Sequence, residues 1–483
     1  MSRSMNRREF LGRSACGGAA VVALANSRSA RSYAANEKLD VALIGVGGRG
    51  GWFVQTIPRM ENVVAFCDID SRKIAGAFKR CADLATRFAA SEHSWEKNAA
   101  PAFKGLAEAK IKTYCDFRKM LDEMGKSIDA VIVATPDHTH AVASAAAIRA
   151  GKPVFCEKPL TRTVHESRAL RELARKGKVA TSMGNQGTYS GAFRRALELI
   201  RNGAIGKVGE VHVWNSGGGA DRKQPPKGGQ PIPKELKWDL WLGPAAERSY
   251  DPQWMKRNLW RDFGTCQLGN WASHTANLGF MALKVHELWL GEAGGRAKRR
   301  LRVEATSSGI NRLSFPKWEH IRWHAPARAE FGPITIDWYN GRAPGVEKVL
   351  DRAFAGRGEQ DKRRGRFAGT LIVGEKGSIY TTGHNMSFRL LPEDRFKGVQ
   401  CQRPEKVASS RGPEQDWFAA CRGGKAPWAN FDYASALNEF LMLGNVATQF
   451  AGPLDYDPPA MRIVNNEQAD RVLSSEYREG WSL

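Results

Sequence analysis

A short apolar run near the start of the chain leads directly into a loop with glycines at fixed spacing. Residues 39–44 read LDVALI, which favours a strand buried on both faces of a sheet, and residues 45–50 read GVGGRG. In a G-x-G-x-x-G loop, Gly45 permits the tight turn, Gly47 lets a pyrophosphate approach the backbone, and Gly50 allows close packing of the next helix. The run and the loop predict the first βαβ unit of a dinucleotide-binding domain.

A second apolar run, residues 63–70, ends in the sequence CDID. It places Asp68 18 residues beyond Gly50, where a unit of this kind carries an acidic residue for the adenosine ribose. A carboxylate there accepts hydrogen bonds from both ribose hydroxyls and repels a 2′-phosphate, so the sequence favours NAD over NADP. The alternative is that Asp68 is an ordinary turn residue at the end of a strand.

The alternation of strands and helices continues to about residue 160. We expect helices over 71–88, 117–125 and 140–151, strands over 112–115, 129–136 and 153–159, and a polar insertion over 91–110. This spacing predicts an α/β fold with a doubly wound parallel sheet, a Rossmann domain. Functional loops gather at the carboxyl ends of such strands. The candidate loops are 45–50, Asp68, 135–138 and 157–159.

The first 35 residues have the pattern of a leader. The pair Arg7-Arg8 precedes a short apolar stretch, residues 15–25, and small residues follow at 32–34. The pattern resembles a twin-arginine export signal and predicts a periplasmic protein with no stable membrane anchor. The alternative is a disordered basic N-terminus.

The formal net charge of +23 raises the question of a nucleic-acid partner. Part of the excess lies in the leader, and the densest basic stretch beyond it, residues 362–367, lacks the interleaved aromatic side chains of a base-stacking groove. We expect a solvated loop there and no nucleic-acid partner. We also expect no metal, because the eight cysteines include no C-x-x-C pair and nothing completes a site around His138 and His140.

Four segments at the expected strand ends carry a resemblance to a known family. They are GVGGRG at 45–50, CDID at 67–70, ATPDHTHA at 134–141 and CEKPL at 156–160. With them the chain resembles the Gfo/Idh/MocA oxidoreductases, the family of glucose–fructose oxidoreductase and inositol dehydrogenase. Further segments are similar to the secreted, sugar-associated branch of that family: MGNQGTY at 183–189, WDLWLGP at 238–244, DFGTCQLGNWASH at 262–274 and FDYASAL at 431–437.

The resemblance implies that a C-terminal α/β domain with a large, mainly antiparallel sheet follows the Rossmann domain. The 483 residues are enough for two domains. The resemblance also implies a substrate pocket between the domains, NAD as the cofactor and a nicotinamide near Lys158. We further expect a homo-oligomer and a small carbohydrate substrate. The division that we predict is a leader at 1–35, an NAD-binding Rossmann domain at 36–160 and a substrate-binding domain at 161–483.

In many members of this family a lysine, an aspartate and a histidine act on the substrate hydroxyl. Lys158 matches the lysine and His274 the histidine, but Asn270 stands at the aspartate position. A lysine buried beside a cationic nicotinamide is suited to accept a proton, because its charged form is disfavoured. The alternatives are an ion pair of Lys158 with Glu157, a core histidine at 274 and a turn role for Asn270. The predicted cofactor-binding residues are Gly45, Gly47, Arg49, Gly50, Asp68, Thr135, Pro136, His138, His140, Glu157, Lys158 and Asn185.

These features predict a NAD-dependent oxidoreductase for a hydroxyl of a sugar, glycoside or polyol. A protein that is exported folded cannot rely on free NAD outside the cytoplasm, so we expect the cofactor to be loaded first, held tightly and recycled. Two alternatives stay open. One is redox-neutral, NAD-dependent cleavage or epimerisation of a glycoside, and the other is a sugar- or NAD-binding protein without catalysis, which Asn270 favours.

Overall fold

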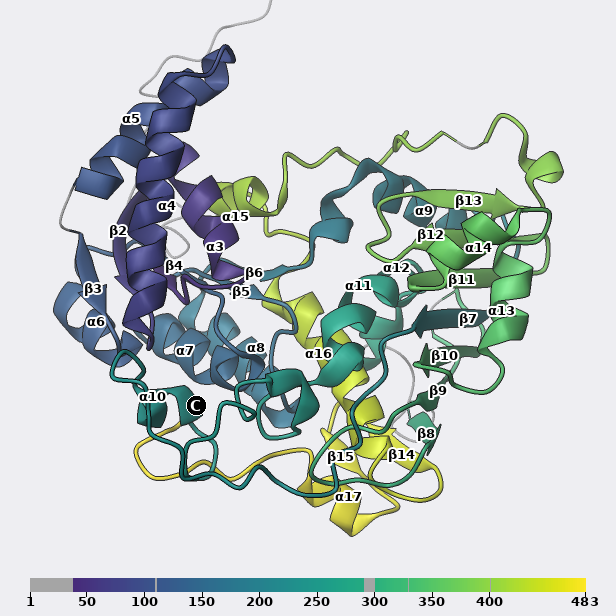
Figure 1. Ribbon diagram of the computed structural model, residues 1–483. Coiled ribbons are helices and arrows are strands. Elements are labelled where there is room, and N and C mark those ends of the chain that lie inside the picture. Colours follow the sequence, from purple (N-terminus) through teal and green to yellow (C-terminus); the bar gives the residue numbers. More distant parts are fainter. Residues whose placement is uncertain (1–37, 109–110, 291–299, 329, 400) are drawn as a thin grey trace, which may run out of the picture.

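A computed structural model describes residues 38–108, 111–290, 300–328, 330–399 and 401–483. The predicted leader, residues 1–35, lies outside the described residues. Two β-sheets stand at opposite sides of the molecule, and helices lie between them (Figure 1). No helix in the described ranges combines the length and the apolar character needed to cross a bilayer.

The smaller sheet has, within the described residues, six parallel strands in the order β3-β2-β1-β4-β5-β6. The strands are β1 Asp40–Ile44, β2 Asn62–Cys67, β3 Lys112–Tyr114, β4 Ala130–Val133, β5 Val154–Glu157 and β6 Thr181–Gly184. Helices α3 Gly50–Thr56, α4 Ser71–Ala89 and α5 Ser94–Glu108 cover one face, and α6 Phe117–Met124, α7 Asp137–Arg149 and α8 Val164–Gly177 cover the other. Both faces of the central strands are buried, which explains why β1, β2, β4 and β5 are mainly apolar. The predicted doubly wound parallel sheet is confirmed.

Two elements of this domain differ from the prediction. Residues 91–110, which we expected to be a polar insertion, contain α5, whose Phe103 and Leu106 pack in the same core as α4. The sheet also continues past residue 160, because β6 pairs with β5. The sequence of β6, TSMG, has no apolar run to mark a strand, and α5 exposes much of its surface between its few buried side chains.

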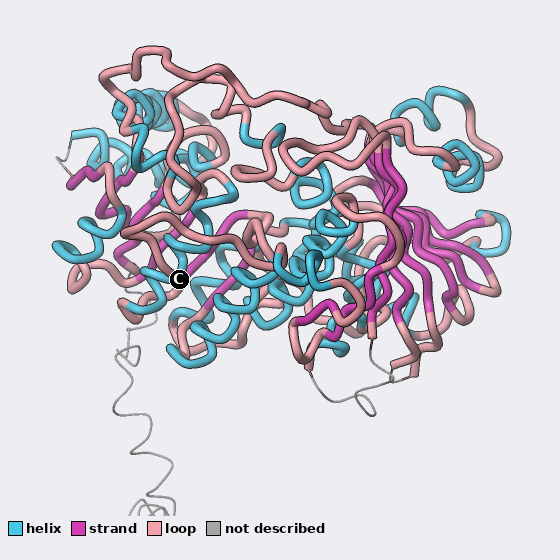
Figure 2. The backbone as a smooth tube through the Cα atoms, turned by 90° about the horizontal axis from the view of Figure 1, so that it is seen from below, coloured by secondary structure: helices cyan, strands magenta, loops and turns pink. Residues whose placement is uncertain are grey.

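The larger sheet has nine strands in the described part of the chain, in the order β13-β12-β11-β7-β10-β9-β8-β14-β15. Strands β7 and β10 pair in parallel, and the other neighbours are antiparallel. The strands are β7 Val208–Asn215, β8 Leu301–Ser307, β9 Glu319–Ala325, β10 Ile334–Asn340, β11 Ala368–Gly374, β12 Gly377–Thr382, β13 Phe388–Leu391, β14 Leu454–Asp457 and β15 Arg462–Ile463. Figure 2 shows these strands gathered at one side of the molecule, as the family resemblance implied.

Two helices lie near the edge of this sheet that is formed by β11 to β13 (Figure 1). Helix α13, Val346–Ala353, buries Leu350 and Ala353 against Trp214 and Tyr380 of the sheet. Helix α14, Glu359–Gly365, contains most of the basic stretch 362–367. The prediction of a loop at this stretch is therefore wrong, because most of it is helical. Most of these side chains are nevertheless exposed. A lysine- and arginine-rich surface helix has no apolar face from which the sequence could be recognised as helical.

Helix α16, Phe431–Ala447, connects the two domains. Its Glu439 is fully buried, and the carboxylate accepts two hydrogen bonds of 2.9 Å from the guanidinium of Arg168 on α8. Trp289 Nε1 and the Tyr456 hydroxyl donate to the same carboxylate at 2.8 and 2.9 Å. The pair thus joins a helix of the Rossmann domain to β14 of the larger sheet.

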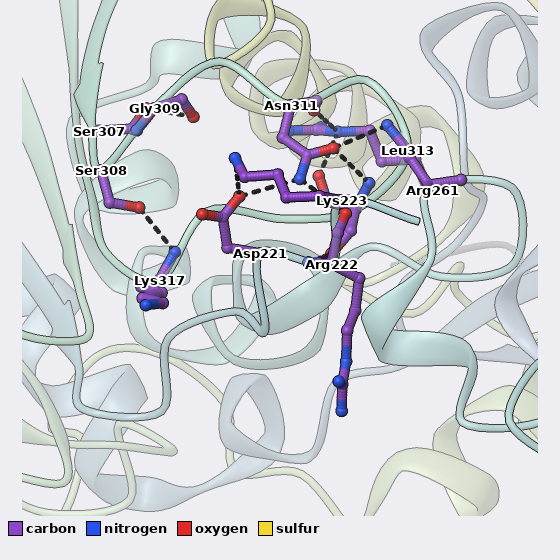
Figure 3. Close-up of polar contacts among 11 residues, drawn as sticks. Asp221, Arg222, Lys223, Arg261, Ser307, Ser308, Gly309, Asn311, Leu313 and Lys317 are labelled. Carbon is purple, nitrogen blue, oxygen red and sulfur yellow. Dashed lines mark hydrogen bonds and ion pairs between the residues drawn. The ribbon is translucent and has the colours of Figure 1, made fainter. Parts of the chain in front are cut away.

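The segment after β7 crosses from the larger sheet to the Rossmann domain, and polar contacts hold its start (Figure 3). The Asp221 carboxylate accepts hydrogen bonds from Asn311 Nδ2 at 2.9 Å and from Lys223 Nζ at 2.8 Å. The Nε of buried Arg261 donates to the Asn311 carbonyl at 2.8 Å, which ties the loop before β9 to the same network.

The same segment then forms backbone hydrogen bonds with the end of β2. The Ser71 N–H donates to the Glu235 carbonyl at 3.0 Å, and the Lys237 N–H donates to the Ile69 carbonyl at 2.9 Å. Helix α10, Trp238–Leu242, follows at once. The crossing segment, residues 216–260, is therefore held at both domains, and it brings α10 against the strand end that carries Asp68.

Candidate active site

The loop between β1 and α3 has the backbone geometry that its glycines predict. Gly45 has φ +84°, and a Cβ there would lie 2.6 Å from the Ala134 carbonyl oxygen of the neighbouring strand end. A Cβ on Gly50 would lie 2.0 Å from the Gly45 carbonyl oxygen. Side chains at either position would clash with backbone, so the tight turn and the close approach of α3 both require glycine.

A cavity of about 400 Å³ opens beside this loop, and both domains line it. Gly45, Gly47, Arg49, Asp68, Thr135 and Pro136 contribute from the Rossmann domain. Leu240, Trp241, Met255 and Arg257 contribute from the crossing segment. Six of the twelve predicted cofactor-binding residues therefore share one cavity, and Gly50 packs directly behind it.

Asp68 lies half-buried in the wall of this cavity, at the end of β2. Its Oδ2 accepts a hydrogen bond from the Val46 N–H at 3.0 Å, and its Oδ1 accepts one from the Asp70 N–H at 3.1 Å. Burial raises the pKa of the Asp68 carboxyl, although these backbone donors oppose the change. The side chain is held against the glycine loop, where the predicted contact with a ribose requires it.

Glu157, at the end of β5, forms an ion pair with Arg49. Arg49 Nε lies 2.8 Å from Glu157 Oε1, and the carboxylate is almost fully buried. A Cβ on Gly184 of β6 would lie 2.6 Å from the same oxygen, so glycine makes room for the pair. The alternative that Lys158 pairs with Glu157 through its side chain is not what the structure shows. The pair links the glycine loop to the strand end that carries Lys158.

Lys158 donates its side-chain hydrogen bonds to Asn270. Nζ lies 2.5 Å from Asn270 Oδ1 and 3.1 Å from the Asn270 carbonyl oxygen. Asn270 lies in η5, Leu268–Ala272, a single π-helical turn of a kind that is frequent at functional sites. Burial lowers the pKa of the Lys158 ammonium below its ordinary range, against the opposing charges of Glu157 and Asp137. The lysine is therefore poised to be a neutral amine nearer physiological pH than an exposed lysine.

His274 lies one turn beyond Asn270 and is also buried. Its Nδ1 is 3.1 Å from Asn185 Oδ1, while Asn185 Nδ2 donates to the Ser273 carbonyl at 2.5 Å. Burial, together with the charge of Lys158, lowers the pKa of His274 well below its ordinary value. The ring is neutral with its proton on Nδ1, which leaves the lone pair of Nε2 as an acceptor. Lys158, Asn270, His274 and Asn185 thus come together as one group.

Two further residues near this group were not among the predicted site residues. Asp137, 1% exposed, accepts a hydrogen bond from Thr265 Oγ1 at 2.8 Å and forms an ion pair with Arg257. Burial alone would raise the pKa of the Asp137 carboxyl, but the charge of Arg257 and the other donors lower it. Asp137 follows Pro136 at a strand end, and that position is the signal that could have marked it.

His384 is the second missed residue. It lies in the hairpin between β12 and β13, and its ring centre is 4.6 Å from that of His274 and 5.0 Å from that of Trp271. No local pattern in the sequence marks a histidine in this hairpin, because its importance depends on a contact between segments more than a hundred residues apart.

His138 and His140, both predicted as cofactor-binding residues, lie inside α7 and do not line the cavity. His138 Nε2 is 2.7 Å from the Trp241 carbonyl oxygen, and burial lowers the pKa of this ring to about 4. His140 donates from both ring nitrogens, to the carbonyls of Pro159 and Thr135 at 2.7 and 2.8 Å. Burial opposes its charge, but Cys156 and Asp137 help to raise the pKa of His140 to about 9. Both rings support the loops that form the site.

In chemical terms, the group offers a proton acceptor, Lys158, and two neutral hydrogen-bonding side chains, Asn270 and His274. Within the ranges that the structure defines, no set of three or more His, Cys, Asp or Glu side chains is arranged to hold a metal ion. The charges of two carboxylates, Glu157 and Asp137, act on the acceptor, and each of them forms an ion pair with an arginine of the cavity wall, Arg49 and Arg257.

The Rossmann domain matches a known protein family. The profile of the Gfo/Idh/MocA oxidoreductases, described as an oxidoreductase family with an NAD-binding Rossmann fold, matches residues 39–185. Residues 39–185 therefore resemble the NAD-binding domain of the Gfo/Idh/MocA oxidoreductases. The match confirms the predicted resemblance and the NAD-binding fold, and it includes β6, beyond the predicted domain end at residue 160.

Named proteins that are similar to this chain match it over part of their length. Levoglucosan dehydrogenase of Pseudarthrobacter phenanthrenivorans is 32% identical over 127 residues, which are 24% of this chain and 32% of that protein. A glycosyl hydrolase family 109 protein of Stenotrophomonas maltophilia is 28% identical over 212 residues, 44% of this chain and 41% of that protein. The chain therefore matches roughly a third to two fifths of the length of these relatives.

Solved structures of the same architecture extend over both domains. An aldose–aldose oxidoreductase from Caulobacter crescentus superposes with a TM-score of 0.52 at 15% identity, covering 86% of this chain and 99% of that one. At this identity the likeness establishes the two-domain fold and does not define the substrate.

Proposed function

We propose that this protein is a NAD-dependent oxidoreductase that acts on a hydroxyl of a sugar, glycoside or polyol. The observation that carries the proposal is the half-buried Lys158, which is hydrogen-bonded to Asn270 and lies in the field of two ion pairs, Arg49–Glu157 and Arg257–Asp137, whose arginines line the cavity beside the glycine loop. The loop at 45–50 fits a pyrophosphate, and Asp68 fits the adenosine ribose. When bound, NAD supplies the acceptor for the hydride that leaves the substrate carbon.

Side chains of this protein would accept the proton that the substrate hydroxyl loses. Lys158, as the neutral amine, accepts the hydroxyl proton, and its lowered pKa makes that form more accessible than in an exposed lysine. His274 presents the lone pair of Nε2, which can accept a hydrogen bond from a sugar hydroxyl and fix the ring that reacts. Asn270 orients the lysine by accepting its hydrogen bond, without adding a charge.

A screen of carbohydrates tests the proposal. Purified protein with NAD is mixed with aldoses, polyols and glycosides, and the absorbance of reduced nicotinamide is followed together with mass spectra of the products. Oxidation of at least one of these compounds, dependent on NAD, is the expected result. A protein that binds NAD but leaves every compound unchanged would match the non-catalytic alternative.

We also propose that the protein is exported by the twin-arginine route and carries its NAD with it. The pair Arg7-Arg8 and the short apolar stretch behind it support this proposal. Retention for hours needs a dissociation rate of about 10⁻⁴ s⁻¹. With an association rate of roughly 10⁶ M⁻¹s⁻¹, the Kd would be on the order of 10⁻¹⁰ M. Such a cofactor must return to its starting state in each cycle, which a paired oxidation and reduction of two sugars would achieve.

Protein isolated from the periplasm, denatured and analysed for nicotinamide should contain close to one cofactor per chain. Empty protein that turns over continuously with added NAD would show that export and cofactor retention are not coupled.

Redox-neutral cleavage of a glycoside is the second candidate function. The match of 212 residues to a glycosyl hydrolase family 109 protein favours it. Oxidation at one carbon makes a neighbouring hydrogen acidic, so that elimination of the aglycone can follow. Release of 4-nitrophenol from 4-nitrophenyl glycosides, without net accumulation of reduced nicotinamide, would distinguish this reaction from net oxidation.

Replacing Asp68 by alanine should weaken NAD binding. The lost charge-assisted hydrogen bonds contribute about 1.5–3 kcal/mol each, so the Kd should rise by at least about tenfold. Calorimetry with NAD and with NADP measures the effect, and the preference for NAD should narrow because the repelling carboxylate is gone. Asp83→Ala, on the exposed surface of α4, is the control for the same change. An unchanged NAD affinity in the Asp68 variant would refute the assignment of this strand end.

Replacing Asn270 by aspartate should move the pH dependence of turnover to higher pH. A carboxylate at the position of Oδ1, 2.5 Å from Lys158 Nζ, stabilises the ammonium and raises the pKa of Lys158. The lysine must be neutral to accept a proton, so the rising limb of the pH–rate profile shifts to higher pH. Asn270→Ala adds no charge and should give no upward shift. An unmoved limb in Asn270→Asp would mean that Lys158 is not the group that titrates.

A further inference from the structure

A second cavity, called the groove below, lies next to the group around Lys158. Its volume is about 460 Å³, and it is lined by η5, by the hairpin between β12 and β13 and by residues 354–368 at the end of α13 and around α14. Trp271 and His384 belong to its wall. Both rings also contact His274, with ring centres 6.3 and 4.6 Å away. One layer of side chains therefore separates this groove from the proposed point of reaction.

Aromatic side chains form one wall of the groove. Phe367 is 51% exposed, although it is a large apolar side chain, and its ring meets the edge of Trp271 at 4.8 Å and 89°. An exposed Phe367 and a half-buried Trp271 beside polar groups such as Thr382 and His384 offer an aromatic face on which a sugar ring stacks and partners for its hydroxyls. A core role would have buried Phe367.

The far end of the groove is basic. Arg357, Arg364 and Arg389 line it together with one carboxylate, Asp361. Arg357 and Arg389 both pair with Glu393, which lies outside the lining. Arg364 forms no ion pair with any residue in the described ranges, so its guanidinium is available for an anion from outside.

We propose that this groove binds a second ring of the substrate, next to the ring that reacts, and that the second ring carries a carboxylate. The proposal rests on the proposed function, because it takes the group around Lys158 as the place of reaction. Phe367, the exposed ring of the perpendicular pair, would stack on the apolar face of the sugar ring, and the planar fork of Arg364 would bind the carboxylate with two hydrogen bonds. The substrate class is then an acidic disaccharide or a related oligosaccharide.

Calorimetry with two matched pairs of disaccharides tests this assignment: cellobiose against glucuronosyl-β-1,4-glucose, and lactose against galacturonosyl-β-1,4-glucose. The wild-type protein, saturated with NAD, should bind the acidic member of at least one pair about tenfold more tightly than the neutral member. Arg364→Gln should remove this preference and leave the affinity for the neutral member unchanged. Phe367→Ala should weaken both members about equally.

Arg363→Gln is the matched control, since Arg363 is an exposed neighbour that removes the same charge without lining the groove. Equal affinities for acidic and neutral members in the wild type, or the same loss in Arg363→Gln as in Arg364→Gln, would overturn the proposal. NAD affinity and oxidation of simple sugars are measured on the same samples. If the wild type neither binds NAD nor oxidises any sugar, the proposed function fails, whereas the role of the groove is judged from the disaccharide affinities alone.

Discussion

Lys158→Ala is expected to abolish turnover while NAD remains bound. A positioned general base contributes about 10²–10⁴-fold to a rate, and Lys158 is the half-buried amine that donates to Asn270. The loss should appear in kcat, because the lysine is proposed to act in the reaction step, whereas the loop at 45–50 and Asp68, which lie at the cavity, are left intact. Single-turnover measurements with saturating NAD and substrate separate this loss from weaker binding.

Lys126→Ala serves as the control, because Lys126 is an exposed lysine of the same domain. Its rate should equal that of the wild type, and both variants should bind NAD with unchanged affinity. A near-normal rate in Lys158→Ala would place the base elsewhere. His274 would then be the next candidate, and His274→Asn in the Lys158→Ala background would decide whether it acts.

Glu439→Gln is expected to destabilise the whole chain, although it changes one atom. The amide keeps an acceptor for Trp289 and Tyr456 but leaves the buried Arg168 without its countercharge. Breaking a buried pair from one side costs about 3–5 kcal/mol in the free energy of unfolding. Because α16 joins both domains, the larger domain and the Rossmann domain should both unfold at a lower urea concentration than in the wild type. Urea unfolding followed by near-UV circular dichroism measures this midpoint.

The double variant Arg168→Met with Glu439→Gln separates the charge from the packing. It removes the uncompensated guanidinium and retains the amide acceptor, so it should recover most of the lost stability. If the double variant is as unstable as Glu439→Gln, the cost comes from the shape of the pocket and the interpretation as an ion pair is wrong.

The Rossmann domain could be predicted because its signals are local. Strands buried on both faces leave unbroken apolar runs, as in β1 and β4, and the clash that excludes a side chain at Gly50 arises within one loop. Helix α5 and strand β6 carry weaker signals, since one is exposed over much of its surface and the other has the sequence TSMG. The larger sheet was expected from the family resemblance alone, because its strands pair across long stretches of sequence.

The candidate site also contains residues with a recognisable sequence signal and residues without one. Lys158, Asn270 and His274 stand in recognisable segments, and the structure brings them together with Asn185. Asp137 gains its importance from Arg257 and Thr265, which approach it only in the folded chain. His138 and His140 share the segment of Asp137 but turn into α7, and nothing in their spacing shows which side chain faces the cavity.

The backbone hydrogen bonds of Ser71 and Lys237 to the crossing segment have a thermodynamic consequence. They involve Ile69 and Ser71, which follow Asp68 directly, so the strand end that would hold the adenosine is also an attachment point of the other domain. Binding of the nucleotide in the cavity and association of the two domains are then linked equilibria. Each of them makes the other more favourable by the same free energy. Removing the cofactor would loosen the junction between the domains, and opening that junction would be the route by which the cofactor leaves.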